Sequence, residues 1–257
     1  MSALKIPSTK TKQLVVVLIP TFNERDNIRE VVDQILDLRL RHQLQVLVVD
    51  DNSPDKTWEV AEELSRRDDR VHLLLRTKRR GRGAAGIDGF RRALEMGADY
   101  VVEMDGDFSH QPCYIPQLVD ACQIYDLVLG SRFVHGGKDT NRSLLRKFIT
   151  FFVRNYIRSR FHLSIHDASS GFRCFRRKVL EAVDLDDLIS VGPSVVLEIL
   201  YKTHILGFSI GEIPITFIDR EKGRTKLNFL TLVETLVMVI KFKRHYAGLA
   251  RVKQPPA

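Results

Sequence analysis

Short apolar segments alternate with amphipathic segments through the first half of the chain, and this alternation most constrains the fold. Five apolar segments predict buried strands, at residues 14–19, 44–50, 71–76, 100–104 and 126–131. Amphipathic stretches predict helices at about 24–38 and 84–96, with another after Pro112. Buried strands that alternate with helices are typical of a parallel sheet. We therefore predict an α/β fold with a mostly parallel sheet and helices on both faces.

Polar motifs follow four of these predicted strands. They are "PTFNE" (20–24), "DDNSPD" (50–55), "DGDFSH" (105–110) and "GSRF" (130–133). Parallel strands bring their carboxyl ends to one edge of a sheet, where ligands of open α/β folds bind. We therefore expect the four motifs to form one binding site.

The third motif places two carboxylates close together after a strand. Asp105 and Asp107 flank Gly106, which can let the backbone approach a ligand closely. Mg²⁺ and Mn²⁺ bind one or two carboxylates and complete their shell with water and phosphate oxygens. The alternative is an acidic loop that caps the helix after Pro112. The preceding Glu103 is given no catalytic role.

The first two motifs are candidates for nucleotide binding. A carboxylate of Asp50 or Asp51 can accept hydrogen bonds from a base or a ribose. In "PTFNE", Phe22 can stack on a base while Glu24 accepts a hydrogen bond. An ordinary helix start is the alternative for each motif, with Ser53 as the N-cap in the second.

The second half of the chain contains two amphipathic or mostly apolar segments, 144–163 and 227–245, and strand-like residues at 208–219. A formal charge of +8 makes an anionic partner plausible: nucleic acid, membrane or a phosphorylated small molecule. Both segments can lie in a membrane interface or pack on the core. No uncharged apolar run of 18 residues predicts a spanning helix. The three cysteines form no C-x-x-C pair, which argues against a zinc site.

A glycine-rich motif raises an alternative enzyme class. "GRGAAG" (81–86) is a G-x-G-x-x-G sequence with Asp105 nineteen residues beyond it, as in dinucleotide-binding proteins. However, "TKRR" separates these glycines from the preceding strand, and a complete strand–helix–strand unit comes before them. A basic loop near phosphates fits the motif better than a nicotinamide-dependent oxidoreductase does.

Six blocks in order resemble a known family. They are "PTFNE", "VVDDNSPDKT", "EMDGDFSH", "GSRF", "SSGFR" and "FIDREKGRTKL", within residues 14–230. Together the blocks resemble the dolichol-phosphate (polyprenyl-phosphate) mannosyltransferases, which are inverting glycosyltransferases with the GT-A fold. The family often has alanine at the position of Gly106 and glutamine at that of Ser109, so the metal shell is open to a water there.

The resemblance implies a role for residues of every block. The donor-binding residues implied are Pro20, Phe22, Glu24, Val49, Asp51, Asp105, Gly106, Asp107, Arg220 and Lys226. Asp105, Asp107 and Arg132 are the implied catalytic residues. Asp105 and Asp107 are also the metal ligands, with Ser109 acting through water. Arg146 and Thr150 match positions near the acceptor phosphate.

The resemblance also implies an activity and a location. The expected reaction is Mg²⁺- or Mn²⁺-dependent transfer of mannose from GDP-mannose to a polyprenyl (dolichyl) phosphate, with inversion. Alternatives are glucosyl transfer from a UDP-sugar to a lipid phosphate, and a non-catalytic protein that binds sugar nucleotides. The protein is expected on the cytoplasmic face of a membrane (endoplasmic reticulum or plasma membrane), bound peripherally or by small anchoring subunits, without nucleic acid.

Three segments follow from this organisation. Residues 1–12 are expected to be disordered, and residues 13–226 to form the GT-A domain. Residues 227–250 are expected to form an apolar and basic helix at the membrane interface.

Overall fold

A seven-stranded sheet forms the centre of the protein in the computed structural model, which describes residues 12–78, 81–140, 144–190, 192–218 and 229–252. Its strands are β1 (Leu14–Thr21), β2 (Gln43–Asp50), β3 (Val71–Leu75), β4 (Tyr100–Glu103), β5 (Leu127–Ser131), β7 (Arg173–Arg176) and β8 (Ile210–Pro214). They lie in the order β3-β2-β1-β4-β7-β5-β8. Only β7 is antiparallel to its neighbours in this sheet, so the predicted mostly parallel sheet is confirmed.

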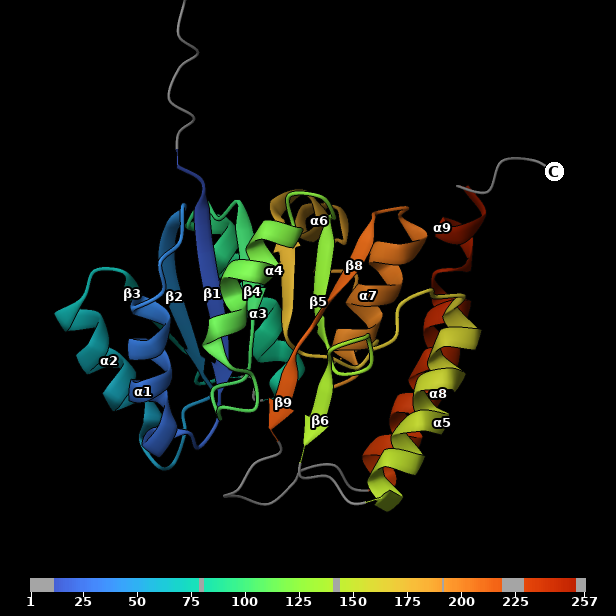
Figure 1. Cartoon of the computed structure of the whole chain (residues 1–257), viewed down its shortest axis with the longest axis horizontal. Helices are drawn as coiled ribbons and strands as arrows, with labels where there is room; N and C mark the ends of the chain where they lie inside the picture. The colour runs from blue at the N-terminus through green and yellow to red at the C-terminus, as the bar shows by residue number, and fades with distance from the viewer. Residues whose placement is uncertain (1–11, 79–80, 141–143, 191, 219–228, 253–257) are drawn as a thin grey trace, which may run out of the picture.

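Helices cover both faces of this sheet (Figure 1). They are α1 (Arg25–Leu36), α2 (Thr57–Arg67), α3 (Arg82–Glu95), α4 (Ile115–Ala121), α5 (Leu144–Phe161), α6 (Arg177–Ala182), α7 (Val195–Ile205), α8 (Phe229–His245) and α9 (Ala247–Val252). A short 3₁₀ helix, η1 (Pro112–Tyr114), precedes α4. Val15 and Val17 of β1 pack with α1, α2 and α4, whereas Val16 and Leu18 pack on the opposite side with α3 and α5 to α8. This alternation follows from the period of two in a strand.

A second sheet lies at the carboxyl ends of the parallel strands (Figure 1). It consists of β6 (Lys138–Thr140) and β9 (Thr216–Ile218), paired in parallel. The strand-like segment predicted at 208–219 therefore contributes to two sheets: β8 belongs to the main sheet and β9 to the small one. The break falls at Ile215, which is buried beside Gly130.

Helices α5 and α8 lie side by side (Figure 1). Ile157 and Phe161 of α5 are buried in the core, as are Val239 and Phe242 of α8. Earlier in α5, the aromatic side chains are 50–63% exposed: Phe148, Phe151 and Phe152. One face of each helix therefore packs on the protein, and the first half of α5 also presents an aromatic surface. No helix in the described ranges combines the length and apolarity that crossing a bilayer requires.

The predicted helix start at Ser53 is wrong. Helix α2 begins at Thr57, and Lys56 precedes it with a φ of 63°. The Ser53 hydroxyl instead donates to Asp50 Oδ2 at 2.7 Å. Asp55 accepts hydrogen bonds from both the backbone N–H and the hydroxyl of Thr57, so Asp55 stabilises the first turn.

Candidate active site

The ends of β1 and β2 are joined by a buried carboxylate. Asp50 is fully buried and accepts hydrogen bonds from the hydroxyls of Thr21 (2.8 Å) and Ser53 (2.7 Å). Its other oxygen accepts the Ser53 N–H at 2.8 Å. Asp50 therefore fixes the two loops that follow these strands.

Asp51 links the end of β2 to the start of α3. One of its oxygens accepts a hydrogen bond from the Arg76 guanidinium, and the other accepts the Gly81 N–H at 2.7 Å. Arg76 also binds Asp88 of α3, at 2.8 Å. The "GRGAAG" motif therefore opens helix α3 beside Asp51, with Gly81 as its N-cap at a φ of 137°. Glycine suits this position because other residues adopt such angles only with strain.

The acid-rich motif has an arginine as a positive partner. Arg82, in the first turn of α3, donates to Glu103 Oε1 at 2.7 Å and to Asp105 Oδ1 at 3.1 Å. Burial disfavours the charge on Arg82, but Glu103 and Asp105 outweigh that effect and raise the pKa of its guanidinium. Arg82 thereby offsets repulsion between the carboxylates, and Glu103, which lacks a predicted role, holds Arg82 in place.

Ser109 orients Asp107, the second carboxylate of the acid pair formed by Asp105 and Asp107. Its N–H and hydroxyl both donate to Asp107 Oδ1, at 3.1 and 2.6 Å. Phe108 between them has a φ of 61°, in the left-handed region. Ser109 is 3% exposed, whereas Asp107 is only partly buried. The serine therefore holds a carboxylate that is partly exposed.

His110 is a neutral structural residue of the site. Its Nδ1 accepts the Asp105 N–H at 3.0 Å, and its ring stacks on Phe172 at a centroid distance of 5.1 Å. Burial lowers the pKa of His110, against the opposing effect of Asp105. A nitrogen that accepts a hydrogen bond carries no proton, so the nearby Asp105 carboxylate, 3.6 Å away, forms no ion pair with His110.

Arg132 is held by a buried bidentate ion pair. Its Nε and Nη2 donate to the two oxygens of Asp167, each at 2.7 Å, and Nη2 also donates to Ser169 at 3.0 Å. The Asp167 carboxylate is fully buried and Arg132 is 8% exposed. Burial alone would raise the pKa of Asp167, but Arg132 outweighs it and lowers the pKa. The guanidinium plane is thereby fixed at the end of β5.

The arginine of "SSGFR" has a structural role. Arg173 is fully buried and donates to the backbone oxygens of Ala168, Ser170 and Val196, at distances of 2.5–2.8 Å. Burial lowers the pKa of Arg173 to about 10, so it remains charged at neutral pH. Arg173 therefore ties the loop that carries Asp167 to the start of α7.

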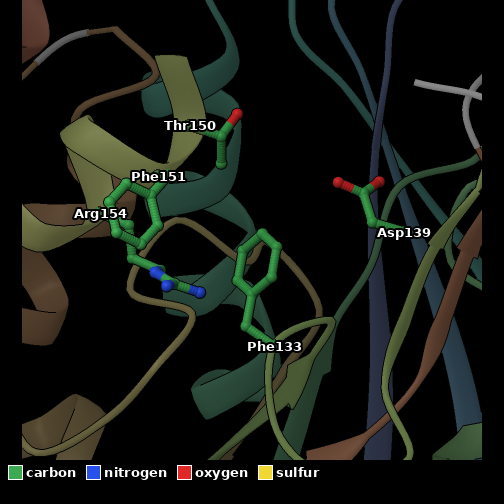
Figure 2. A pocket seen from close by; sticks show the side chains of 5 residues that line it. All are labelled: Phe133, Asp139, Thr150, Phe151 and Arg154. Atoms are coloured by element: carbon green, nitrogen blue, oxygen red, sulfur yellow. The ribbon is translucent and has the colours of Figure 1, made fainter. Parts of the chain in front are cut away.

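A chain of ring contacts connects the acid pair to a cavity. The His110 ring packs against Phe217 (5.7 Å), and Arg132 lies over the rings of Phe217 (5.1 Å) and Phe133 (5.0 Å). Phe133 lines a cavity of about 340 Å³ together with Asp139, Thr150, Phe151 and Arg154. Figure 2 shows Phe151 and Arg154 on one side of this cavity and Asp139 on the other. Thr150, an expected acceptor residue, therefore lies in a cavity next to the sheet edge.

The remaining predicted donor-binding residues differ in their burial and contacts. Pro20 is buried, and the Val49 side chain is fully buried in the core, so Val49 offers a ligand only its backbone. Phe22 is partly buried, and Glu24 accepts a hydrogen bond from Asn27 at 2.9 Å. A Cβ on Gly106 would meet Ile19 Cγ2 at 3.2 Å, so its small size serves packing against β1.

Some predictions fall outside the described residues. They are Arg220, Lys226 and residues 1–11, as well as the side chain of Arg146, which belongs to α5.

The acid pair fits a divalent cation that also binds phosphate. Asp105 and Asp107 offer hard carboxylate oxygens, and the Asp105 side chain is 31% exposed. Among the described residues, no group of three or more His, Cys, Asp and Glu side chains could enclose an ion. Two carboxylates suit Mg²⁺ or Mn²⁺ when substrate phosphates complete the shell, and they do not suit a fully protein-enclosed metal.

Sequence reasoning missed the charges that hold the site together. Arg76 and Arg82 pair with Asp51 and Asp105, and Asp167 pairs with Arg132. The only sequence signal for Arg82 was its place in a basic, glycine-rich loop near a predicted phosphate site. Asp167 lies two residues before "SSGFR", and no local pattern marks it as a partner of Arg132.

Comparison with known proteins identifies the family. The profile of Glycosyl transferase family 2 matches residues 16–184. The chain is 40% identical over 228 residues to the undecaprenyl-phosphate mannosyltransferase of Micrococcus luteus, covering 89% of this chain and 93% of that protein. It is 38% identical over 242 residues to the polyprenol monophosphomannose synthase of Mycolicibacterium smegmatis, covering 92% and 89%.

A solved structure supports the fold. Glucosyl-3-phosphoglycerate synthase from Mycobacterium tuberculosis, crystallised with Mn²⁺, UDP and phosphoglyceric acid, superposes with a TM-score of 0.66 at 18% identity, covering 95% of this chain and 80% of that one. This likeness confirms the predicted GT-A fold. The family match and the 40% identity to a mannosyltransferase reject the oxidoreductase alternative, and the chain belongs to Glycosyl transferase family 2, whose members are glycosyltransferases.

Proposed function

We propose that the protein transfers mannose from GDP-mannose to a polyprenyl phosphate with inversion at the anomeric carbon. The observation that carries this proposal is the 40% identity, over 89% of the chain, to a protein named for mannosyl transfer to undecaprenyl phosphate. The arrangement of the site supports it, because the acid pair and the cavity are linked through Arg132.

The donor is assigned to the side of the site formed by β1, β2 and β4. Asp105 and Asp107 would hold Mg²⁺ or Mn²⁺, which supplies Lewis-acid stabilisation of the charge on the departing diphosphate. Ser109 keeps the Asp107 carboxylate in one orientation. Of the residues expected to bind the nucleotide, Phe22, Glu24 and Asp51 follow β1 and β2.

The other donor contacts of this proposal are the backbone at Pro20, Val49 and Gly106 and the diphosphate-binding side chains Arg220 and Lys226.

The acceptor phosphate supplies its own nucleophile. A phosphomonoester has a second pKa near 6 and is therefore largely dianionic at neutral pH. Such a group attacks the anomeric carbon without a protein general base. Arg146 and Thr150 are proposed to bind this phosphate, while the Asp167 pair keeps Arg132 fixed beside the reacting groups.

A transfer assay tests this function. Purified protein is incubated with radiolabelled GDP-mannose, polyprenyl phosphate and Mg²⁺ or Mn²⁺, and label is expected in the organic-extractable product. Omission of the metal, or addition of EDTA, is expected to abolish the transfer. Label that stays in the aqueous phase with every metal and acceptor chain length would contradict the proposal.

The same assay separates the remaining alternatives. Transfer from UDP-glucose in place of GDP-mannose would keep the enzyme class but change the donor. Calorimetric binding of GDP-mannose without any turnover would identify a non-catalytic sugar-nucleotide-binding protein. We expect GDP-mannose to be the preferred donor.

The exposed aromatic residues of α5 suit peripheral contact with a membrane. Phe148 packs on Phe152 and Phe151 packs on Phe152, with ring centroids 4.7 and 5.7 Å apart, so the three rings form one patch.

We assign residues 13–226 to the catalytic domain and 227–250 to an interfacial segment. We place the membrane contact on the cytoplasmic face, where small anchoring subunits can strengthen it.

Replacing one ring of this patch is expected to weaken membrane binding. Phe148→Ser should lower the partition coefficient onto anionic phospholipid vesicles by about threefold to tenfold, because less apolar area is buried in the interface. Sedimentation with vesicles measures this effect. Ile124→Ser is the control, since Ile124 is even more exposed (76% against 63%) but follows α4. Equal partition coefficients for Phe148→Ser and Ile124→Ser would show that the aromatic patch of α5 does not contact the membrane.

A further inference from the structure

Arg154 extends the row of predicted acceptor residues along α5. It lies four residues after Thr150, so both side chains project from one face of the helix. The Arg154 guanidinium carbon lies 4.7 Å from the centre of the Phe133 ring and 5.5 Å from that of Phe151. Figure 2 shows these side chains on the wall of the cavity. The aromatic rings thereby hold the guanidinium at the cavity.

The Arg154 guanidinium differs from the other arginines of the site in its partners. Arg76, Arg82 and Arg132 each form an ion pair with a carboxylate. Within the part of the chain that the structure describes, no hydrogen-bond acceptor or carboxylate pairs with Arg154. The Nε atoms of Arg154 and of Arg158 are both buried without a partner, but Arg158 also donates to the backbone oxygen of Ser164, at 3.4 Å. A guanidinium without a carboxylate partner can bind an anionic ligand through its N–H groups.

The cavity combines this cation with apolar walls. Phe133 and Phe151 supply two rings, and Thr150 supplies a hydroxyl. Asp139 lines the other side and has an interaction partner of its own. A volume of about 340 Å³ fits a small headgroup with a short apolar segment, and not a long chain. These walls suit an anion that is bonded directly to a hydrocarbon.

Phe151 belongs both to the wall of the cavity and to the aromatic patch of α5. Phe151 lines the cavity, is 50% exposed and packs against Phe152. A hydrocarbon chain too long for the cavity can therefore leave it along Phe151 without crossing a polar surface. The ring of Phe133, which lines the cavity, also contacts Arg132. The cavity thus lies between the reacting groups and the proposed membrane surface.

We propose that Arg154 binds the phosphate of an isoprenoid phosphomonoester, while Phe133 and Phe151 contact its first isoprene unit. This inference rests on the proposed function and adds a specificity-determining residue to it. Arg154 recognises the phosphate and the rings recognise the hydrocarbon, so the site selects lipid phosphates over free phosphate and over isoprenoid alcohols.

Equilibrium binding tests this inference without any catalytic turnover. Calorimetry is carried out with farnesyl phosphate, farnesol and inorganic phosphate as three separate ligands. Arg154→Met keeps an unbranched side chain for packing on the rings but removes the charge and the donors. It is expected to lower the affinity for farnesyl phosphate at least about tenfold, and to leave calorimetric binding of GDP-mannose with Mg²⁺ unchanged.

Two further variants control for charge and for folding. Arg158→Met removes the same charge from α5 one turn away, outside the residues that line the cavity, and should change the affinity for farnesyl phosphate less than about twofold. Arg154→Lys keeps the charge but loses the planar guanidinium, and an intermediate affinity is expected. Circular dichroism and thermal unfolding confirm that each variant is folded.

The outcomes separate this inference from the proposed function. Farnesyl phosphate affinity that is equal in Arg154→Met and Arg158→Met would overturn the role of Arg154, even if the wild-type protein transfers mannose. Inorganic phosphate that binds as tightly as farnesyl phosphate would overturn the lipid selectivity. If the wild-type protein fails to transfer mannose but binding still depends on Arg154, the proposed function fails and the phosphate site stands.

Discussion

Replacing Asp107 by asparagine is expected to lower kcat/KM for mannosyl transfer at least about a thousandfold while the protein remains folded. The substitution preserves the shape of the side chain and one oxygen that can accept the hydrogen bonds of Ser109. It removes the negative charge, so a neutral amide oxygen replaces a carboxylate oxygen that attracts a hard divalent cation more strongly. Loss of metal stabilisation at the departing diphosphate amounts to several kcal/mol, and each 1.4 kcal/mol corresponds to about a factor of ten.

Metal binding gives this prediction a readout besides activity. Mn²⁺ affinity, measured by electron paramagnetic resonance with GDP present, should fall together with kcat/KM. Asp120→Asn removes an exposed aspartate of α4 and should leave both quantities within about twofold of the wild type. An Asp107→Asn variant with wild-type Mn²⁺ affinity would exclude Asp107 as a ligand.

Local patterns predicted the strands of the main sheet whose sequences are continuously apolar. All side chains of β1 from Val15 to Thr21 are buried, so its apolar sequence alone indicated a central strand. Strand β7 lacked such a signal, because its four residues, "RCFR", begin and end with arginine. The buried Arg173 is stabilised by three backbone oxygens, two of them in the preceding loop and one in α7, and no periodicity describes such an arrangement.

The sequence predicted the site residues that lie close to one another in the chain. Asp105 and Asp107 follow a strand directly, so their position at the sheet edge could be expected from the sequence. Arg82, the partner of Asp105, comes from helix α3 and lies 23 residues before it in the chain. The Arg132–Asp167 pair spans 35 residues, and only the folded arrangement of β5 and the loop before β7 brings the two together. Long-range pairs of this kind depend on the tertiary structure and not on spacing.

Breaking the Arg132–Asp167 pair is expected to give the largest loss of stability. Asp167→Asn places an amide N–H₂ against guanidinium donors and leaves the charge of a nearly buried arginine without compensation. Removing one partner of a buried ion pair typically lowers the free energy of unfolding by about 3–5 kcal/mol. Urea unfolding of the wild type and the variant at neutral pH measures the difference.

An exposed ion pair supplies the matched control for this variant. Asp186 also pairs with an arginine, Arg91, but its side chain is 84% exposed. Asp186→Asn should therefore lower the free energy of unfolding by less than about 1 kcal/mol, because water screens an exposed pair. Equal effects of the two substitutions would show that the buried pair contributes no more than a surface contact.

The dependence on pH distinguishes a lost charge from a lost packing contact. The pKa of Asp167 is lower in the folded protein than its ordinary value of 3.8, because Arg132 outweighs the effect of burial. Its carboxylate therefore contributes stability that is fully present above the unfolded pKa and is lost as pH falls through the folded pKa. The difference in unfolding free energy between wild type and Asp167→Asn should be constant near neutral pH and should shrink below about pH 4. A difference that stays constant at acidic pH would mean that packing, and not the ion pair, accounts for the destabilisation.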